Sequence, residues 1–149
     1  MAKKVSVVYI EITKRKSPKS CLMGTQVYWE GIDLPGKQLE VLVIVKLPFP
    51  NISDPMVQAW TERLKAQNRN AFREYLLPEA VLELKQGIGR LLRGAGDRGV
   101  VLLLDNRVMT EPYGISFART WKNNHQVVNN VEDVINACTE FLQPSPQEV

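Results

Sequence analysis

The sequence predicts an α/β protein with a mostly parallel sheet. The chain has 149 residues, of which 44% are hydrophobic and 23% are charged, as in an ordinary globular domain. Strand-like runs and helix-like segments alternate along the chain, which is typical of α/β folds. Two of the runs, 39–47 and 99–105, are almost continuously apolar, as are strands covered on both faces of a parallel sheet. We therefore expect helices on both faces.

Four strands are predicted from runs of β-branched residues and leucine. Each run is bounded by Gly, Pro, Lys or Asp, residues that commonly end strands. The runs are 5–12 (VSVVYIEI), 21–25 (CLMGT), 39–47 (LEVLVIVKL) and 99–105 (GVVLLLD). All of them are far too short to span a bilayer, so no membrane association is expected.

The first predicted helix begins at Ser53, Asp54 and Pro55. A capping side chain followed by proline at the first helical position is a strong start signal, because the capping oxygen accepts from an unpaired amide and proline has no amide to leave unpaired. Apolar residues at helical spacing follow, and we expect this helix to end near Asn68.

Two further helices are expected. Pro78 should open the second, which runs to about Arg93 and is closed by Gly94. The third should cover 131–142, before a loose tail at 143–149.

The second helix has one polar and one apolar face. At 100° per residue from Gln86, Arg90 falls about 40° to one side and Arg93 about 20° to the other. The opposite side gathers the apolar residues Val81, Leu84, Ile88, Leu91 and Leu92. Gly87 and Gly89 flank the polar face and cost about 1 kcal/mol each relative to alanine. We therefore expect something to approach this face closely.

Helical geometry alone leaves two interpretations of this polar face open. It can be an ordinary solvated surface. Two guanidinium groups one turn apart are also well suited to gripping phosphate oxygens. The sequence QGIGRLLR (86–93) decides between them, because its form Gln-x-x-Gly-Arg-x-x-Arg resembles motif VI of superfamily-two helicases.

The resemblance extends over much of the chain. GTQVYWEGIDLPG (24–36) resembles motif V of the DinG and XPD branch of those helicases. Further segments are similar to the C-terminal helicase region of that branch, namely KLPFP (46–50), SDP (53–55), 72–93 and DRGVVLLLDNRV (97–108). We expect the similarity to cover roughly residues 20–120, and we find no match for the first twenty residues.

The resemblance implies the C-terminal part of the second RecA-like lobe of a DinG-like DNA helicase. Its fold would be a partial RecA-like (P-loop NTPase-type) three-layer domain. In this family ATP lies between two lobes, so Arg90 and Arg93 would face its phosphates and Gln86 would position them. The resemblance also implies that the ATP cleft is bordered by Glu30, Gly31, Asp33 and Gly89. It implies that Gly24 and Thr25 bind DNA.

The resemblance places ATP and Mg²⁺ mainly on a lobe outside this chain. No Gly-x-x-x-x-Gly-Lys-Ser/Thr phosphate loop and no Asp-Glu-Ala-His box occur in the sequence. We therefore expect no cofactor to be bound by this chain alone, and no ATP hydrolysis by it. Cys21 and Cys138 lie far apart beside a single histidine, which predicts no metal site and favours a reducing cytoplasm.

The expected organisation has three parts: a basic segment at 1–19 with a possible extra strand, an incomplete second lobe at 20–142 and the tail at 143–149. The expected partners are a first helicase lobe, or the full-length helicase, and single-stranded DNA. An alternative is a stand-alone truncated module that binds single-stranded nucleic acid or a partner without catalysis. Six lysine and arginine residues before residue 20 support it, since clustered basic side chains attract phosphate.

Overall fold

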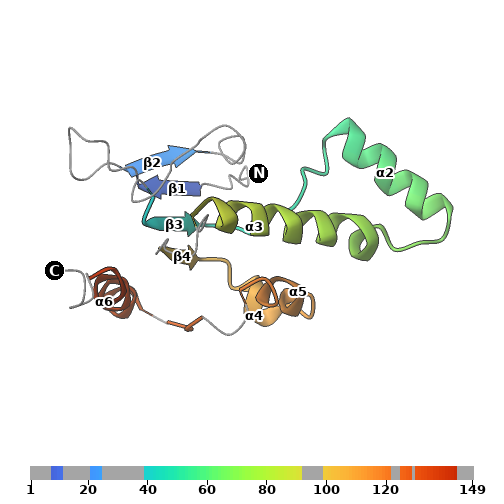
Figure 1. Ribbon diagram of the computed structural model, residues 1–149. Coiled ribbons are helices and arrows are strands. Elements are labelled where there is room, and N and C mark those ends of the chain that lie inside the picture. Colours follow the sequence, from blue (N-terminus) through green and yellow to red (C-terminus); the bar gives the residue numbers. More distant parts are fainter. Residues whose placement is uncertain are drawn as a thin grey trace.

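The structure, a computed structural model, describes residues 8–11, 21–24, 39–91, 99–121, 125–128 and 130–143. Its centre is a four-stranded sheet in the order β2-β1-β3-β4 (Figure 1). The strands are β1 (Val8–Glu11), β2 (Cys21–Gly24), β3 (Val41–Ile44) and β4 (Val100–Leu103). Each lies within one of the four predicted runs.

The expectation of a mostly parallel sheet is wrong for the strand pairings. β3 and β4 are parallel, but β1 pairs antiparallel with both β2 and β3. The short connection at 12–20 explains the antiparallel β1–β2 pair, because parallel neighbours need a crossover of about a dozen residues or more. β2, β3 and β4 nevertheless point the same way, and β1 alone is reversed between them.

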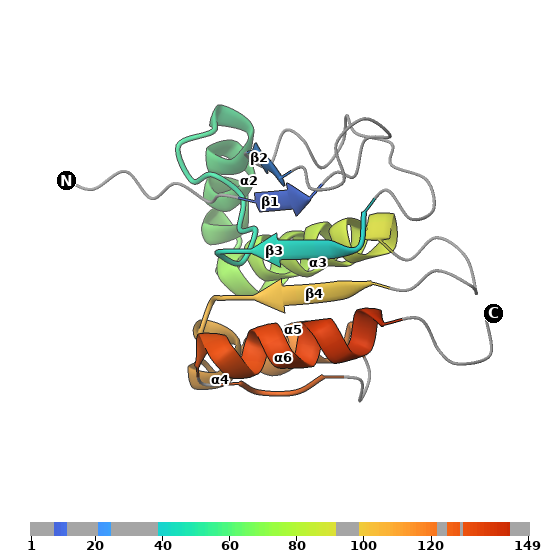
Figure 2. The same ribbon diagram turned by 90° about the vertical axis from the view of Figure 1, so that its left-hand side faces the viewer.

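Helices lie on both sides of the sheet, as expected. α3 (Leu77–Leu91) lies on one side, and α6 (Val131–Leu142) lies on the other side next to β4 (Figures 1 and 2). The core between the sheet and α3 is aliphatic with one aromatic ring. Its most buried members are Leu42, Ile44, Leu47, Ala80, Leu84, Leu91 and Phe117.

The first predicted helix is confirmed as α2 (Pro55–Ala66). The side chain of Asp54 accepts a hydrogen bond from the amide of Met56 at 2.8 Å, which satisfies an amide that the first turn leaves unpaired. Asn68 has a φ of 54°, the left-handed conformation that closes many helices and that asparagine tolerates well.

The second helix begins earlier than predicted. A π-helical turn, η2 (Phe72–Leu76), leads directly into α3, so Pro78 lies inside a continuous helical segment and not at its start. The amide of Leu77 donates to the carbonyl of Phe72, five residues back. We attribute the tolerance of Pro78 to this wider turn, because proline in a plain α-helix clashes with the carbonyl four residues before it. The predicted end at Arg93 and Gly94 lies outside the described residues.

Two short helices follow β4 that the sequence did not predict. They are α4 (Arg107–Thr110) and α5 (Gly114–Ala118). The third predicted helix has the expected bounds as α6, and its N-cap Asn130 accepts from the amide of Asp133 at 2.8 Å. Within the ranges that the structure describes, no helix is long and apolar enough to cross a membrane.

Candidate functional site

α3 separates buried and exposed side chains in the way its sequence predicts. Leu84 and Leu91 are buried against the sheet, whereas Gln86 is exposed and Arg90 is half-buried. Val81 and Ile88 pack at the border of the core. The predicted polar face therefore exists, although Arg90 lies toward its buried edge and Gly87, expected to flank it together with Gly89, is buried.

Gly89 lies on this exposed face with open space beside it. A Cβ atom added at Gly89 would meet no atom of another side chain or segment within 4 Å. The close approach that we expect here is therefore not made by the described residues of this chain. Because the glycine weakens the helix without relieving contact with any described residue, the space leaves room for a group outside the described part of the chain to approach.

The polar face lies at the end of the sheet where β4 begins. Leu91, next to Arg90, packs directly on Gly99. The contact is so close that a Cβ added at Gly99 would lie 2.6 Å from Cδ1 of Leu91. β4 starts at the following residue. Gly89 and Arg90 thus lie near the amino-terminal ends of the parallel strands, and Gln86 lies about one turn earlier on the same helix.

Gly24 lies at the opposite end of the sheet. It is the last residue of β2 and pairs with Val8, which also pairs with Ile44 at the end of β3. Ile44 pairs in turn with the end of β4. The predicted phosphate-facing group and the predicted DNA-binding glycine are therefore separated by the length of the strands.

Several predicted site residues fall outside the described part of the chain. The structure shows three of the predicted ATP-site residues together, Gln86, Gly89 and Arg90, and it shows Gly24 apart from them. Those outside are Thr25, Glu30, Gly31, Asp33 and Arg93.

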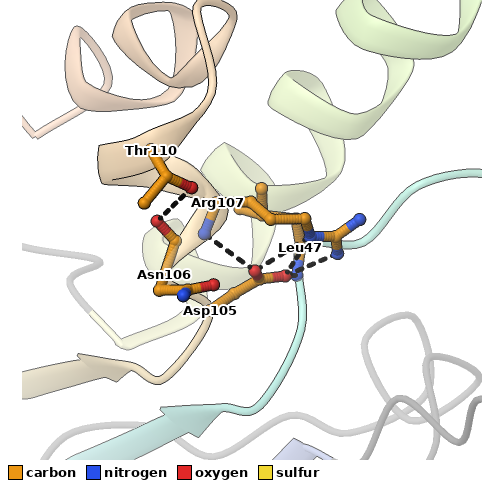
Figure 3. A network of polar contacts seen from close by, with 5 residues as sticks. All are labelled: Leu47, Asp105, Asn106, Arg107 and Thr110. Carbon is orange, nitrogen blue, oxygen red and sulfur yellow. Dashed lines mark hydrogen bonds and ion pairs between the residues drawn. The ribbon is translucent and has the colours of Figure 1, made fainter.

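A partly buried ion pair that sequence reasoning missed, between Asp105 and Arg107, lies at the carboxyl-terminal ends of β3 and β4. The carboxylate of Asp105 accepts from the backbone amide of Leu47 at 2.8 Å and from that of Arg107 at 3.1 Å. It also accepts from Nε of Arg107 at 2.9 Å (Figure 3). An acid directly after an apolar strand, two residues before an arginine, was the available signal.

The ion pair holds both side chains in their charged forms. Burial raises the pKa of Asp105, but hydrogen bonds from the Arg107 side chain and from the amides of Leu47 and Arg107 together outweigh it, so the net pKa lies below its usual value. The same hydrogen bond with Asp105 raises the pKa of Arg107. The Arg107 guanidinium also lies 5.6 Å from the ring centroid of Phe49, within the range of a cation–π contact.

An aromatic cluster packs beside this ion pair. Phe49 stacks on Phe72 at 5.8 Å and meets Tyr113 and Phe117 edge-on at 5.7 and 5.8 Å between ring centroids. Ring pairs at these distances and angles are favourable beyond the area they bury. At this end of the sheet the Asp105 carboxylate is therefore paired, and four aromatic rings pack against one another, within the chain.

Comparison with known proteins assigns the family. The helicase C-terminal domain family matches residues 2–124. The match begins near residue 1, which corrects our expectation that the first twenty residues have no counterpart in the family. The strand β1 therefore belongs to the matched region.

Similar proteins include helicases and a nuclease by name. The chain is 45% identical over 105 residues, 70% of its length, to "3'-5' exonuclease DinG" of Bacillus subtilis, and covers 11% of that protein. It is 38% identical over 128 residues, 86% of its length, to "ATP-dependent DNA helicase YoaA" of Haemophilus influenzae, and covers 19% of it. It is 45% identical over 96 residues, 64% of its length, to the Escherichia coli protein of the same name, and covers 15% of that protein.

The matched segment is thus a small part of each of these relatives. Between 11% and 19% of their length is covered, so their activities describe much longer proteins. The residues matched by the family nevertheless include the whole described sheet, α2 and α3. This chain belongs to the helicase C-terminal domain family and corresponds to a C-terminal part of DinG-like helicases.

Proposed function

We propose that the chain is the C-terminal lobe of an ATP-dependent DNA helicase, and that the polar face of α3 supplies arginines to an ATP site completed by a first lobe. The observation that carries the proposal is the geometry of α3. One side is buried in the core, and the other presents Gln86, Arg90 and the open space at Gly89. In a helicase C-terminal domain, this face is suited to meet a nucleotide held by a second body.

In this proposal Arg90 and Arg93 contact the phosphates, and Gln86 positions them. A guanidinium delivered across an interface neutralises charge that develops on the transferred phosphoryl group, an effect of about 10³ to 10⁵ in rate in related systems. ATP and Mg²⁺ are held mainly by the first lobe. Three residues outside the described part of the chain, Glu30, Gly31 and Asp33, would border the same cleft.

DNA would contact the other end of the sheet. Gly24 lies at the carboxyl-terminal end of β2, and the following Thr25 would offer a hydroxyl and an amide to a phosphate of single-stranded DNA. The sheet then separates the DNA contact from the ATP contact. Because the strands and α3 form one packed core, movement at the nucleotide would be transmitted to the DNA as a rigid-body displacement.

The test needs a two-lobed protein that carries this chain. Residues 2–124 would replace the matching segment of the Haemophilus influenzae relative, and steady-state ATP hydrolysis would be measured with single-stranded DNA present. Arg90→Ala and Arg93→Ala should each lower turnover by about 10³ or more, since the transferring phosphate loses a charge partner. Arg93→Lys should restore little, because an ammonium group cannot reproduce the planar guanidinium.

The matched control is Arg73→Ala. Arg73 is an exposed arginine in η2, at the opposite end of the same continuous helical segment, and its loss should leave ATP turnover unchanged. Thermal melting of each variant shows whether the fold survives. A correctly folded Arg90→Ala or Arg93→Ala variant with normal turnover would contradict the proposal and return this face to an ordinary solvated surface.

A further inference from the structure

Gly99 lies where the end of α3 meets the start of β4, and no larger residue fits there without movement. A Cβ atom at Gly99 would lie 2.6 Å from Cδ1, 2.7 Å from Cγ and 2.9 Å from Cδ2 of Leu91. Carbon atoms in contact normally stand about 3.5 Å apart or more. Gly89 on the polar face differs, because a Cβ there would meet no atom of another side chain or segment within 4 Å. Gly99 is therefore required by a contact within the chain.

Leu91 cannot make room for such an atom by changing its rotamer. Rotation about its Cβ–Cγ bond exchanges the two methyl groups but leaves Cγ in place, 2.7 Å from the added atom. Rotation about its Cα–Cβ bond would carry the side chain into its neighbours, because Leu91 is buried in a core cluster that also contains Leu84 and Leu42. The backbone of one of the two segments must move instead.

The start of β4 is anchored by the sheet. The amide of Val100, next to Gly99, donates to the carbonyl of Glu40 at 2.8 Å. Val100 also pairs with Val41, where the parallel pairing of β3 and β4 begins. Moving the strand would break these hydrogen bonds, whereas moving the last turn of α3 only shifts side-chain packing. We therefore expect the end of the helix to give way.

The last turn of α3 leads into the arginines of the proposed ATP site. Arg90 directly precedes Leu91, and Arg93, outside the described residues, follows two residues later. Relieving the overlap at Gly99 needs a shift of roughly 1 Å, the difference between 2.6 Å and an ordinary carbon contact. Because the turn moves as a unit, the guanidinium of Arg90 would move with it. Misplacement of this size can lower the rate of a reaction about 100-fold.

We propose that Gly99 is a positioning residue of the ATP site: its lack of a side chain lets Leu91 pack against the start of β4, and this contact sets the position of Arg90 and Arg93. The inference rests on the proposed function, in which these arginines meet phosphates held by the first lobe. Gly99 itself would not touch the nucleotide. It acts by setting how closely the end of α3 approaches the sheet.

The first test is Gly99→Ala in the two-lobed graft described above. We expect kcat for ATP hydrolysis in the presence of single-stranded DNA to fall about 10- to 100-fold. The KM for ATP should change less than about twofold, because the first lobe supplies most of the ground-state contacts. Ile44→Val is the matched control. Ile44 is fully buried in the same core but lies at the far end of β3, so this variant should melt earlier and keep its kcat.

The second test asks whether the effect passes through Leu91. Leu91→Ala removes Cγ and both Cδ atoms, which are the atoms that the added Cβ would meet. In that background Gly99→Ala should change kcat less than about twofold. Leu91→Ala alone removes the same contact from the helix side, so it should lower kcat with the KM for ATP nearly unchanged. This variant tests the proposal even if Gly99→Ala does not fold.

A folded Gly99→Ala variant with normal kcat would overturn the proposal. An equal fall in kcat with and without Leu91→Ala would also overturn it, because the effect would then not pass through Leu91. The proposed function fails differently. If Arg90→Ala and Arg93→Ala lower turnover but Gly99→Ala does not, the positioning role is wrong and the proposed function stands. If the arginine variants keep normal turnover, the proposed function fails and the positioning role fails with it, even where Gly99→Ala lowers kcat.

Discussion

The two ends of the sheet are built differently. At the carboxyl-terminal ends of β3 and β4, Asp105 and Arg107 pair with each other, and Phe49 packs among other aromatic rings. At the amino-terminal end, Gln86 is exposed and the space beside Gly89 is open. At the ends of β3 and β4 these charged and aromatic side chains stabilise the chain itself, whereas the amino-terminal end leaves an exposed glutamine and an open space that, in the proposed function, faces the nucleotide. Substitutions at the first end should therefore change folding, and substitutions at the second should change activity.

The largest change in stability is expected at Gly114, where α5 begins. A Cβ atom there would overlap the carbonyl oxygen of Val108 and lie 2.6 Å from its carbonyl carbon, so backbone must move to admit it. Gly114→Ala should lower the free energy of unfolding of the chain by about 3–5 kcal/mol. Urea unfolding followed by circular dichroism measures this. An unchanged unfolding midpoint would show that α4 and α5 are not packed as described.

The next largest change is expected at Asp105. Asp105→Asn removes the negative charge that faces Arg107 but keeps an oxygen able to accept from the amide of Leu47. We expect a loss of about 2–3 kcal/mol in the free energy of unfolding, somewhat less than for a buried pair broken outright. In contrast, Asp133→Asn, at an exposed position of α6, should lower the free energy of unfolding by less. If both variants unfold alike, the ion pair does not hold the two strand ends together.

Acid should remove the contribution of Asp105 gradually. Its folded pKa lies below its usual value, so its stabilising effect is complete above the unfolded pKa, about 3.9, and is lost as pH falls through the folded pKa. The difference in unfolding free energy between the wild type and Asp105→Asn should therefore narrow below about pH 4. A difference that stays constant down to pH 2 would mean that the carboxylate does not stabilise the fold through its charge.

The smallest change in stability, with the opposite sign, is expected at Gly89. Because the space beside it is open, Gly89→Ala should stabilise the isolated chain by about 0.5–1 kcal/mol through improved helix propensity. In the two-lobed graft the same methyl group should lower ATP turnover, since in the proposed function the nucleotide would approach from this side. A variant that is more stable and fully active would show that the open space has no role in the ATP site.

Local sequence signals predicted the individual elements well. Asp54, Pro55 and Asn68 fixed the ends of α2, because each acts through contacts within a few residues. Local sequence signals also predicted α6 and the four strands. Helical periodicity also separated Leu84 from Gln86 correctly, since burial of one face of a helix depends on angular position.

The remaining features depend on contacts between distant segments. The reversed direction of β1 is set by its partners, and an apolar run has the same composition in either direction. α4 and α5 are too short to be stable through local propensity, and they rely on Asp105 and on the contact between Gly114 and Val108. Of the candidate site, sequence alone placed Gln86, Gly89 and Arg90 on one face but did not show that Gly24 lies at the far end of the sheet.

The π-helical turn η2 sets the angular relation between α2 and α3. A π turn accommodates roughly one residue more than an α turn, and each residue rotates the direction of the following side chains by about 100°. Deleting one residue between Phe72 and Leu76 would therefore turn the polar face of α3 away from its present orientation relative to α2. It would also bring Pro78 against a carbonyl that the wider turn now avoids. Insertions and deletions in this short segment should consequently be tolerated far less than substitutions of its exposed side chains.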